Sequence, residues 1–208
     1  MKKVLSMALI ICAVAIGIYA QNNSEQIIFE ETFSGKLSDG WRWIKEEPAD
    51  WRIKDDGLEI CVRPGNAQSV KNALIRQAPD RNNGKYAIEV TIKNLQPPTN
   101  QFEQAGITWY CNGKPVFKLV KELVDGKILI IPGRKPVTND TTQLRLIVDK
   151  NSYIAQYRDN AGGDFLTATS GNLPPPENDE VSIQCYHGSD DDDRWVRFDD
   201  FRIIRLSD

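Results

Sequence analysis

The sequence predicts an all-β protein built as a two-sheet antiparallel β-sandwich. Short runs rich in Val, Ile, Tyr, Phe, Trp and Thr recur along the chain, and clusters of Gly, Pro, Asn and Asp separate them. This succession of strand and turn residues is typical of a sandwich. Almost no segment spaces its apolar residues with the period of a helix. The sequence shows no internal repeat, so it predicts one domain.

The expected strands follow from these runs, and the turns follow from dipeptides that tolerate positive φ. We expect turns at Asp56-Gly57, Asn83-Gly84, Asn112-Gly113 and Asp125-Gly126, the last joining two alternating runs as a hairpin. The expected strands cover residues 27–33, 51–54, 58–63, 73–77, 86–94, 103–111, 116–124, 127–131, 143–149, 153–158, 165–170, 181–187 and 195–206.

Residues 1–20 have the pattern of a secretory signal peptide. Lys2 and Lys3 precede an apolar run over 4–19, and Ala20 comes directly before a polar stretch. The run is short for a transmembrane helix, which needs roughly 20 apolar residues, and no basic cluster follows it. We therefore expect cleavage near Gln21, a mature domain over 21–208, a secreted or periplasmic location, and no membrane insertion after cleavage.

Charge and cysteine content narrow the classes of partner. The chain has 26 Lys and Arg against 29 Asp and Glu, and loss of the two signal lysines leaves 24 against 29, a net charge near −5. A nucleic-acid partner requires a basic stripe, which this sequence lacks, so none is expected. Cys61, Cys111 and Cys185 remain after cleavage, each in an apolar run. At most one bridge can form among three thiols, and buried free cysteines are the simpler interpretation; the pairing stays open.

Strand alternation predicts a polar face on one sheet. Successive side chains of a strand point to opposite faces. In 103–110, 117–123 and 181–187 one set of positions is mainly apolar and predicts a core layer: Ala105, Ile107 and Trp109; Phe117, Leu119, Lys121 and Leu123; Val181, Ile183 and Cys185. The opposite set predicts an outward polar and aromatic face: Gln104, Thr108, Tyr110, Lys118, Glu122, Ser182, Gln184 and Tyr186.

Scattered motifs resemble one known superfamily. They lie at 29–37, 40–43, 50–60, 103–106, 117–126 and 198–203, in a constant order over nearly the whole mature chain. Together they resemble the concanavalin A-like jelly rolls, and most closely the C-terminal domain of bacterial β-xylosidases and related uncharacterised secreted domains. The resemblance implies a jelly roll. It does not imply one activity, because this scaffold serves lectins, glycanases, lyases and accessory modules alike.

The resemblance implies a sugar-contacting surface on the concave sheet, which the polar face would supply. Sugar rings stack on aromatic side chains, and amides and charged groups bond the hydroxyls. The expected stacking residues are Tyr110, Tyr186 and Trp195, and the expected bonding residues are Gln104, Lys118, Glu122 and Gln184. The alternative is an ordinary solvated sheet face, on which Lys118 and Glu122 form a weak ion pair. Trp41, Trp43 and Trp51 are expected to pack in the core and at its edge.

The sequence supports catalysis less well than glycan binding, and we assign no catalytic residue. A glycosidase needs two carboxylates across a cleft, and alternation places Glu103 on the Ala105 face, away from Glu122. A polysaccharide lyase of this fold uses Gln, His, Arg, Lys and Tyr, and this sequence offers Arg76, Gln104, Lys118, Tyr186 and His187. Alternation places His187, the single histidine, on the Cys185 face. A glycan-degrading enzyme, either hydrolase or lyase, therefore stays the alternative to binding.

The resemblance also implies a structural calcium that joins the first strand to the last. Glu31, Gly35 and Asp200 stand in comparable positions, and calcium favours carboxylate and carbonyl oxygens. Thr32 occupies a place where an acidic residue is common, so one ligand is missing. The run of aspartates at 190–193 lacks the spacing of a calcium loop and predicts a solvated loop.

Three hypotheses follow. The favoured one is a secreted, non-catalytic domain that binds an oligo- or polysaccharide on the concave sheet. The second is an enzyme acting on glycans through the same face. The third is a structural accessory domain with no glycan site. The sugar, the linkage and the oligomeric state are not encoded in any motif.

Overall fold

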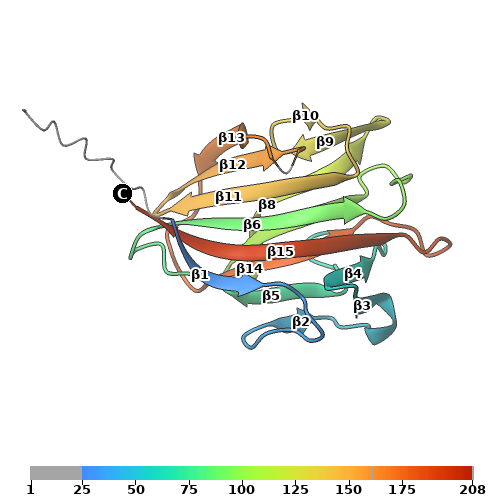
Figure 1. The fold of residues 1–208 in the computed structure, drawn as a ribbon, viewed down its shortest axis with the longest axis horizontal. Helices are drawn as coiled ribbons and strands as arrows, with labels where there is room; N and C mark the ends of the chain where they lie inside the picture. The colour runs from blue at the N-terminus through green and yellow to red at the C-terminus, as the bar shows by residue number, and fades with distance from the viewer. Residues whose placement is uncertain (1–24, 161, 208) are drawn as a thin grey trace, which may run out of the picture.

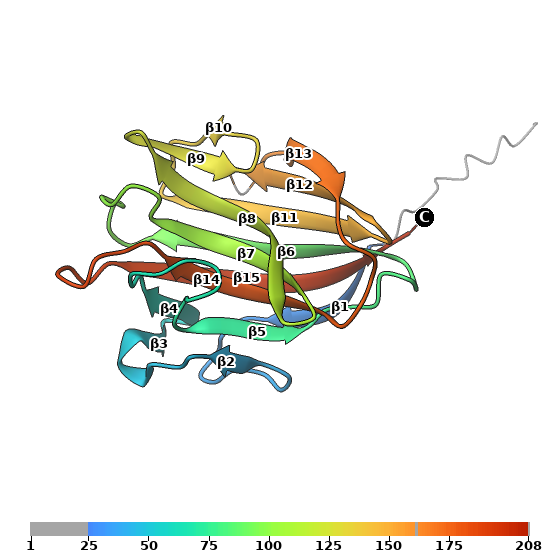
Figure 2. The same cartoon turned by 180° about the vertical axis from the view of Figure 1, so that it is seen from behind.

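The predicted β-sandwich is confirmed by the computed structural model, which describes residues 25–160 and 162–207 (Figures 1 and 2). Two antiparallel sheets stack face to face. Within the described part of the chain, no helix is long and apolar enough to cross a membrane. The expected export signal lies outside the described residues, so it stays a prediction.

One sheet has eight strands in the order β13-β12-β11-β6-β15-β4-β3, with β1 paired to the second half of β15. The long central strands β6 and β15 bring the middle and the end of the chain together (Figure 1). The strands of this sheet are β1 (Gln26–Glu31), β3 (Trp51–Lys54), β4 (Gly57–Cys61), β6 (Lys85–Asn94), β11 (Thr141–Asp149), β12 (Ser152–Arg158), β13 (Leu166–Asn172) and β15 (Trp195–Leu206).

The other sheet has seven strands in the order β10-β9-β8-β7-β14-β5-β2. Figure 2 views the molecule from the side of this sheet. A short 3-10 helix, Pro48–Asp50, precedes β3. The strands are β2 (Arg42–Ile44), β5 (Ala73–Gln77), β7 (Gln104–Cys111), β8 (Lys114–Val124), β9 (Lys127–Ile131), β10 (Lys135–Pro136) and β14 (Asp179–Tyr186).

The core lies between the sheets and contains most of the apolar sets that alternation predicted. Leu123 is half-buried outside it, and Lys121 is buried with its ammonium on the carbonyls of Asn139 and Asp140. Trp109 is fully buried in the core, and Leu119, Ile183 and Cys185 join the same cluster. Burying such side chains stabilises the fold by about 1.5–3 kcal/mol each. The predicted packing of the early tryptophans is confirmed, because Trp41 meets Phe201 edge to face at 4.9 Å. Trp43 and Trp51 pack on each other and on the core.

All three cysteines of the described residues are free thiols, with Cys61 and Cys185 buried and Cys111 half-buried. The simpler of the two interpretations, buried free cysteines, is therefore what the structure has for Cys61 and Cys185. Burial raises the pKa of the Cys61 thiol to about 11. These thiols are poor nucleophiles, because the thiolate is the reactive form.

The strand predictions are close, with errors at short elements. β3, β5, β9 and β15 have the predicted bounds. β2 and β10 were not predicted, because runs of three and two residues give no periodicity.

One turn was predicted a residue too late. Lys54 pairs with Gly57, so the turn is Asp55-Asp56, and both residues have positive φ. Gly57 opens β4 instead, where a Cβ would collide with the Arg197 guanidinium. Asn112-Gly113 and Asp125-Gly126 form the predicted hairpin turns.

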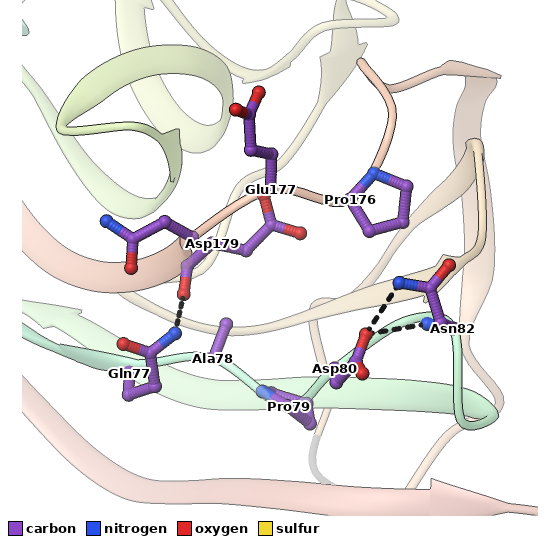
Figure 3. Close-up of a pocket in the computed structure, with 9 residues that line it drawn as sticks. Gln77, Ala78, Pro79, Asp80, Asn82, Pro176, Glu177 and Asp179 are labelled. Carbon is purple, nitrogen blue, oxygen red and sulfur yellow. Dashed lines mark hydrogen bonds between the residues drawn. The ribbon is translucent and has the colours of Figure 1, made fainter.

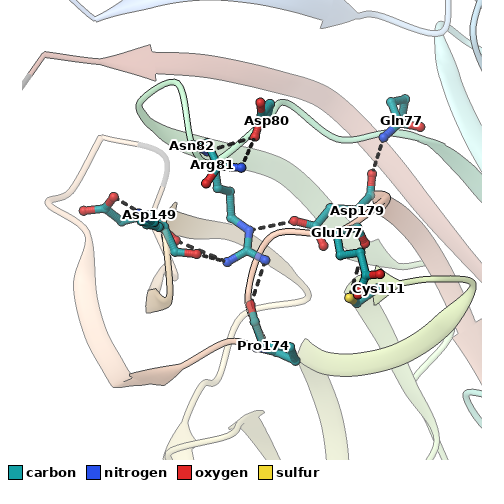
Figure 4. Close-up of polar contacts among 10 residues, drawn as sticks. Gln77, Asp80, Arg81, Asn82, Cys111, Asp149, Pro174, Glu177 and Asp179 are labelled. Atoms are coloured by element: carbon teal, nitrogen blue, oxygen red, sulfur yellow. Dashed lines mark hydrogen bonds and ion pairs between the residues drawn. The ribbon is translucent and has the colours of Figure 1, made fainter.

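A buried arginine fastens one end of the sandwich (Figure 4). Arg81 is 1 % exposed, and its Nε lies 2.8 Å from Asp179 Oδ2. Its other nitrogens donate to the backbone oxygens of Asp149, Lys150 and Pro174. One guanidinium therefore ties together the loop before β6, the turn after β11, the loop after β13 and the start of β14.

Replacing Arg81 with methionine is expected to destabilise the protein by about 3–5 kcal/mol, because Asp179 is left as an uncompensated buried charge. Urea unfolding measures this change. The double variant Arg81→Met/Asp179→Leu should recover part of the loss, since it leaves no buried charge.

Arg205→Met is the matched control, because Arg205 is exposed and donates to the Asn83 carbonyl. This substitution should change the free energy of unfolding by no more than about 0.5 kcal/mol. Equal effects at Arg81 and Arg205 would contradict the role of the buried pair.

Candidate functional site

The predicted polar residues of three strands lie together on the outer face of the seven-stranded sheet. Gln104 on β7 is paired with Tyr186 on β14 and with Glu122 on β8. Thr108 is paired with Lys118 and with Ser182. Since the alternate positions of these strands fill the core, the prediction that these residues share the opposite face is confirmed.

Lys118 is the centre of the polar contacts on this face. Its Nζ donates to Gln104 Oε1 at 2.6 Å and to Glu122 Oε2 at 3.0 Å. The Gln104 amide nitrogen donates in turn to the Phe102 carbonyl at 2.8 Å. The Lys118 side chain keeps 33 % of its surface exposed, whereas the Glu122 side chain keeps 8 %. Gln104 of β7 and Glu122 of β8 thus hold one ordered, partly exposed ammonium group on this face.

His187 also belongs to this face, and the sequence prediction for it was wrong. β14 ends at Tyr186, and His187 has a φ of 64°, so strand alternation does not extend to it. Its ring lies 5.4 Å from the Tyr186 ring and 6.2 Å from the Phe102 ring. Burial lowers the pKa of His187 and nearby Lys118 lowers it further, although Glu122 opposes them. The following Gly188 was a usable signal, because glycine often ends a strand.

We call these six residues the open cluster: Phe102, Gln104, Lys118, Glu122, Tyr186 and His187. Phe102 has 45 % of its surface exposed at the edge of the group. Burial and the neighbouring Glu122 carboxylate raise the pKa of Tyr186, so its phenol stays protonated. The open cluster thus combines the exposed Phe102 ring and the half-buried Lys118 ammonium and His187 imidazole with Gln104, Glu122 and Tyr186, which are buried at 4 %, 6 % and 3 % exposure.

Further along the same face, Tyr110 and Gln184 are covered, which corrects the expectation that these two residues face outward to a sugar or to solvent. The loop over residues 64–71, which we call the strap, joins β4 to β5 and crosses β14 in Figure 2. Its Ala67 and Val70 pack with Ala73 and Tyr186. Gln184 is 0 % exposed and Tyr110 is 3 % exposed. Neither Tyr110 nor Gln184 is open to a sugar in this arrangement.

Hydrogen bonds fix the covered residues. The Tyr110 hydroxyl donates to Gln184 Oε1 at 3.0 Å and lies 3.4 Å from the carbonyl of Ala67 in the strap. Ser182 Oγ donates to the same Gln184 oxygen at 2.9 Å. The Gln184 amide nitrogen and the Thr108 hydroxyl are buried without a hydrogen-bond partner. These two groups lie beneath or beside the strap.

A pocket of about 200 Å³ lies between the strap and β8. Ala67 and Gln68 of the strap form one wall, and residues 115–118 of β8 form another, with Thr108 of β7 between them. Lys118 borders both this pocket and the open cluster. The pocket and the open cluster are therefore continuous parts of one site.

Trp195 does not belong to this site. It opens β15 in the eight-stranded sheet and pairs with Cys61 of β4. The Arg52 guanidinium covers its ring at 4.2 Å. The sequence prediction grouped Trp195 with the polar face by residue type, because periodicity within one strand does not reveal which sheet that strand joins.

Two other residues considered for catalysis also lie elsewhere. The Arg76 guanidinium stacks on the Phe29 ring at 3.2 Å, and burial lowers its pKa to about 10. The Glu103 carboxylate accepts bonds from the backbone of Thr99 and Asn100 and faces Arg194. Glu103 therefore does not form a carboxylate pair with Glu122.

A separate cavity of about 290 Å³ lies at the end of the sandwich near Arg81 (Figure 3). Its walls are residues 77–80, 82 and 176–179. The Asp80 carboxylate accepts hydrogen bonds from the backbone and side-chain nitrogens of Asn82. The Gln77 side chain donates to the Asp179 carbonyl. No aromatic ring lines this cavity, so it lacks a platform for a sugar.

The residues expected to hold calcium do not fit that ion as they are arranged. Glu31 is buried, and its two carboxylate oxygens accept bonds from the backbone N–H groups of Phe33 and Ser38 and from the Trp41 indole. Such donors point hydrogen atoms at the place where a cation would sit. Asp200 is exposed beside the bulge of β15, and Gly35 lies in the loop after β1. Among the described residues, no cluster of three acidic, cysteine or histidine side chains could hold a metal.

Comparisons with known proteins support the fold. No protein-family profile and no curated protein matches the sequence. Among solved structures, the GH43 protein BlXynB (mutant K247S) from Bacillus licheniformis matches with a TM-score of 0.70 at 17 % identity, over 85 % of this chain and 39 % of that one. The chain thus spans well under half the length of that protein.

Two shorter proteins match over nearly their full lengths. The CBM2 module of the evolved Dit of Lactobacillus casei BL23 phage J-1 has a TM-score of 0.58 at 8 % identity, over 88 % of this chain and 97 % of that one. The carbohydrate recognition domain of Emp47p has a TM-score of 0.55 at 8 % identity, over 87 % and 94 %. The fold is therefore the two-sheet jelly roll that the sequence predicted.

The sequence expectation of calcium at Glu31, Gly35 and Asp200 can be tested by thermal unfolding with excess calcium or with a chelator. Because Glu31 is saturated by N–H donors, we expect the same melting temperature in both conditions. A rise with calcium that Asp200→Asn abolishes would show instead that Glu31 exchanges its N–H partners for the ion. Asp56→Asn, at an exposed hairpin turn, is the control for loss of a surface carboxylate.

Proposed function

We propose that this protein binds an oligo- or polysaccharide at the open cluster and acts as a carbohydrate-binding or accessory domain. The observation that carries the proposal is the exposed Phe102 ring, 6.2 Å from the His187 ring, on the same face as the Lys118 ammonium that Gln104 and Glu122 hold. A sugar presents C–H groups on one face and hydroxyls at its rim. An aromatic ring next to fixed polar groups matches both features.

The polar groups of the open cluster are already ordered before any ligand binds. Gln104 and Glu122 hold the Lys118 ammonium, and the Phe102 carbonyl holds the Gln104 amide. Ordering flexible side chains at binding typically costs about 0.5–1.5 kcal/mol for each one. A preformed arrangement avoids much of that cost, which favours recognition of a weakly binding ligand such as a sugar.

Binding explains the cluster better than hydrolysis does. A glycosidase requires a second carboxylate facing Glu122 across a cleft, whereas Glu103 is engaged by backbone N–H groups and faces Arg194. Two of the structural neighbours are described as a carbohydrate-binding module and a carbohydrate recognition domain. We further infer export through the N-terminal signal, which would place the domain where it meets extracellular or periplasmic glycans.

A panel of xylan, cellulose-type β-glucan, pectin and mucin O-glycans tests the proposal. We expect measurable binding that Lys118→Met lowers by about 10- to 100-fold, the loss typical of a hydrogen bond to a charged group. Phe102→Ala should also lower the affinity, because it removes the exposed ring on which a sugar would stack. Lys36→Met, which removes an exposed lysine from the loop after β1, should change nothing. An absence of binding to every glycan, or equal losses in Lys36→Met, would contradict the proposal.

The position of His187 favours polysaccharide lyase activity as a second candidate. β-Elimination needs a base and an acid beside a group that neutralises a uronate carboxylate, and His187, Tyr186 and Lys118 lie together. The lowered pKa of His187 leaves its imidazole neutral, as a base requires. The Tyr186 phenol keeps its proton, but its raised pKa and its 3 % exposure make it a weak acid for a substrate, so binding remains the favoured function.

Release of unsaturated sugar ends from pectin or alginate, followed by ultraviolet absorbance, tests this second candidate. Lyase activity should fall as the pH drops through the lowered pKa of His187, because the protonated imidazole cannot accept a proton. It should be abolished in His187→Ala, with Lys36→Met again as control. Binding without any unsaturated product would leave the carbohydrate-binding function and exclude the lyase.

A further inference from the structure

The strap blocks the polar face in two directions from the open cluster. Along β7, the outward side chains of Gln104, Thr108 and Tyr110 are all buried, so the accessible part of the face is limited to Phe102, Lys118 and His187. Across the sheet towards β5, Tyr186 packs on Val70 of the strap and on Ala73. A sugar chain that lies on the open cluster therefore meets the strap within the same sheet face.

Hydrogen bonds within the strap hold it in one compact turn, so it forms a fixed barrier on the sheet face. The backbone N–H groups of Ser69 and Val70 donate to the Asn66 carbonyl at 3.0 and 2.8 Å. The Asn66 N–H donates to Ser69 Oγ at 2.9 Å, and the Asn66 side chain accepts from the backbone of Gln68 at 2.9 Å. Ala67 and Val70 pack with Tyr186 and Ala73, and this packing holds the bonded turn against the sheet.

The pocket beside the strap has the size and the polar groups of a subsite. Its volume of about 200 Å³ is below the ~300–1,000 Å³ of sites that enclose drug-sized ligands, so it suits one sugar ring. Thr108, which lines the pocket, is fully buried and its hydroxyl has no partner. A buried hydroxyl without a partner costs free energy that a ligand hydroxyl can recover.

We propose that this site receives the end of a glycan chain, with one terminal sugar in the pocket between the strap and β8. The inference rests on the proposed glycan-binding function and names the part of the glycan that is recognised. Lys118 borders both the pocket and the open cluster, so it contacts the terminal sugar and its neighbour. The strap excludes a chain that continues past the pocket.

Oligosaccharide ladders test this proposal on the whole mature protein. Xylo-, cello- and galacturono-oligosaccharides from disaccharide to octasaccharide are titrated calorimetrically, and the number of protein molecules bound per sugar chain is measured. End recognition predicts one protein per chain at every length. A number that rises with chain length would overturn the inference and keep the glycan-binding function. No binding to any ladder would overturn both.

A substitution at the pocket gives a second readout. Thr108→Val keeps the volume of the side chain and removes the unpartnered hydroxyl, so the protein should stay at least as stable as the original. Its affinity for the ladder should fall several-fold, while the ratio of one protein per chain persists. Unchanged affinity in Thr108→Val would show that the terminal sugar does not occupy this pocket. Thr169→Val, on β13 of the other sheet, is the matched control.

Discussion

β7 lies between β8 and β14, and its pairing register with both strands is the constraint on which the site depends. Gln104 is aligned with Glu122 on one side and with Tyr186 on the other. A shift of one residue in either ladder would exchange the faces of a strand and send its polar set into the core. Gly106 marks how closely β7 and β8 approach, because a Cβ there would lie 2.7 Å from the Val120 Cα.

The strap converts this register into a site with a shape. Without residues 64–71, the outer face would be a flat polar sheet, which is what alternation alone predicts. With the strap in place, Tyr110 and Gln184 are buried beneath it and hydrogen-bonded to each other, and Lys118 remains as the ordered polar group that is partly exposed. The same three strands thus supply a buried polar layer over most of the face, and Phe102, Lys118 and His187 mark the part that a ligand can reach.

The sequence predicts the strands and the facing of their side chains well, because both depend on local periodicity. It does not predict the strap, because covering a sheet face is a tertiary event that no local pattern records. The sequence prediction put His187 on the wrong face for a local reason. Its positive φ ends the strand alternation after Tyr186, although the predicted strand continued to residue 187. Trp195 was misplaced for a topological reason, since β15 joins the other sheet. The surroundings of Glu31 depend on Ser38 and Trp41, whose approach follows from the loop after β1.

A glycan bound as proposed contacts the open cluster at the edge of the strap. Titrating an isotope-labelled protein with the glycan that binds best, and following its amide resonances, locates that contact. We expect the largest shifts at Phe102, Gln104, Lys118 and His187, with smaller shifts in the strap. Shifts centred on the end cavity near Asp80 and Glu177, or on Trp195 in the other sheet, would contradict the proposed contact.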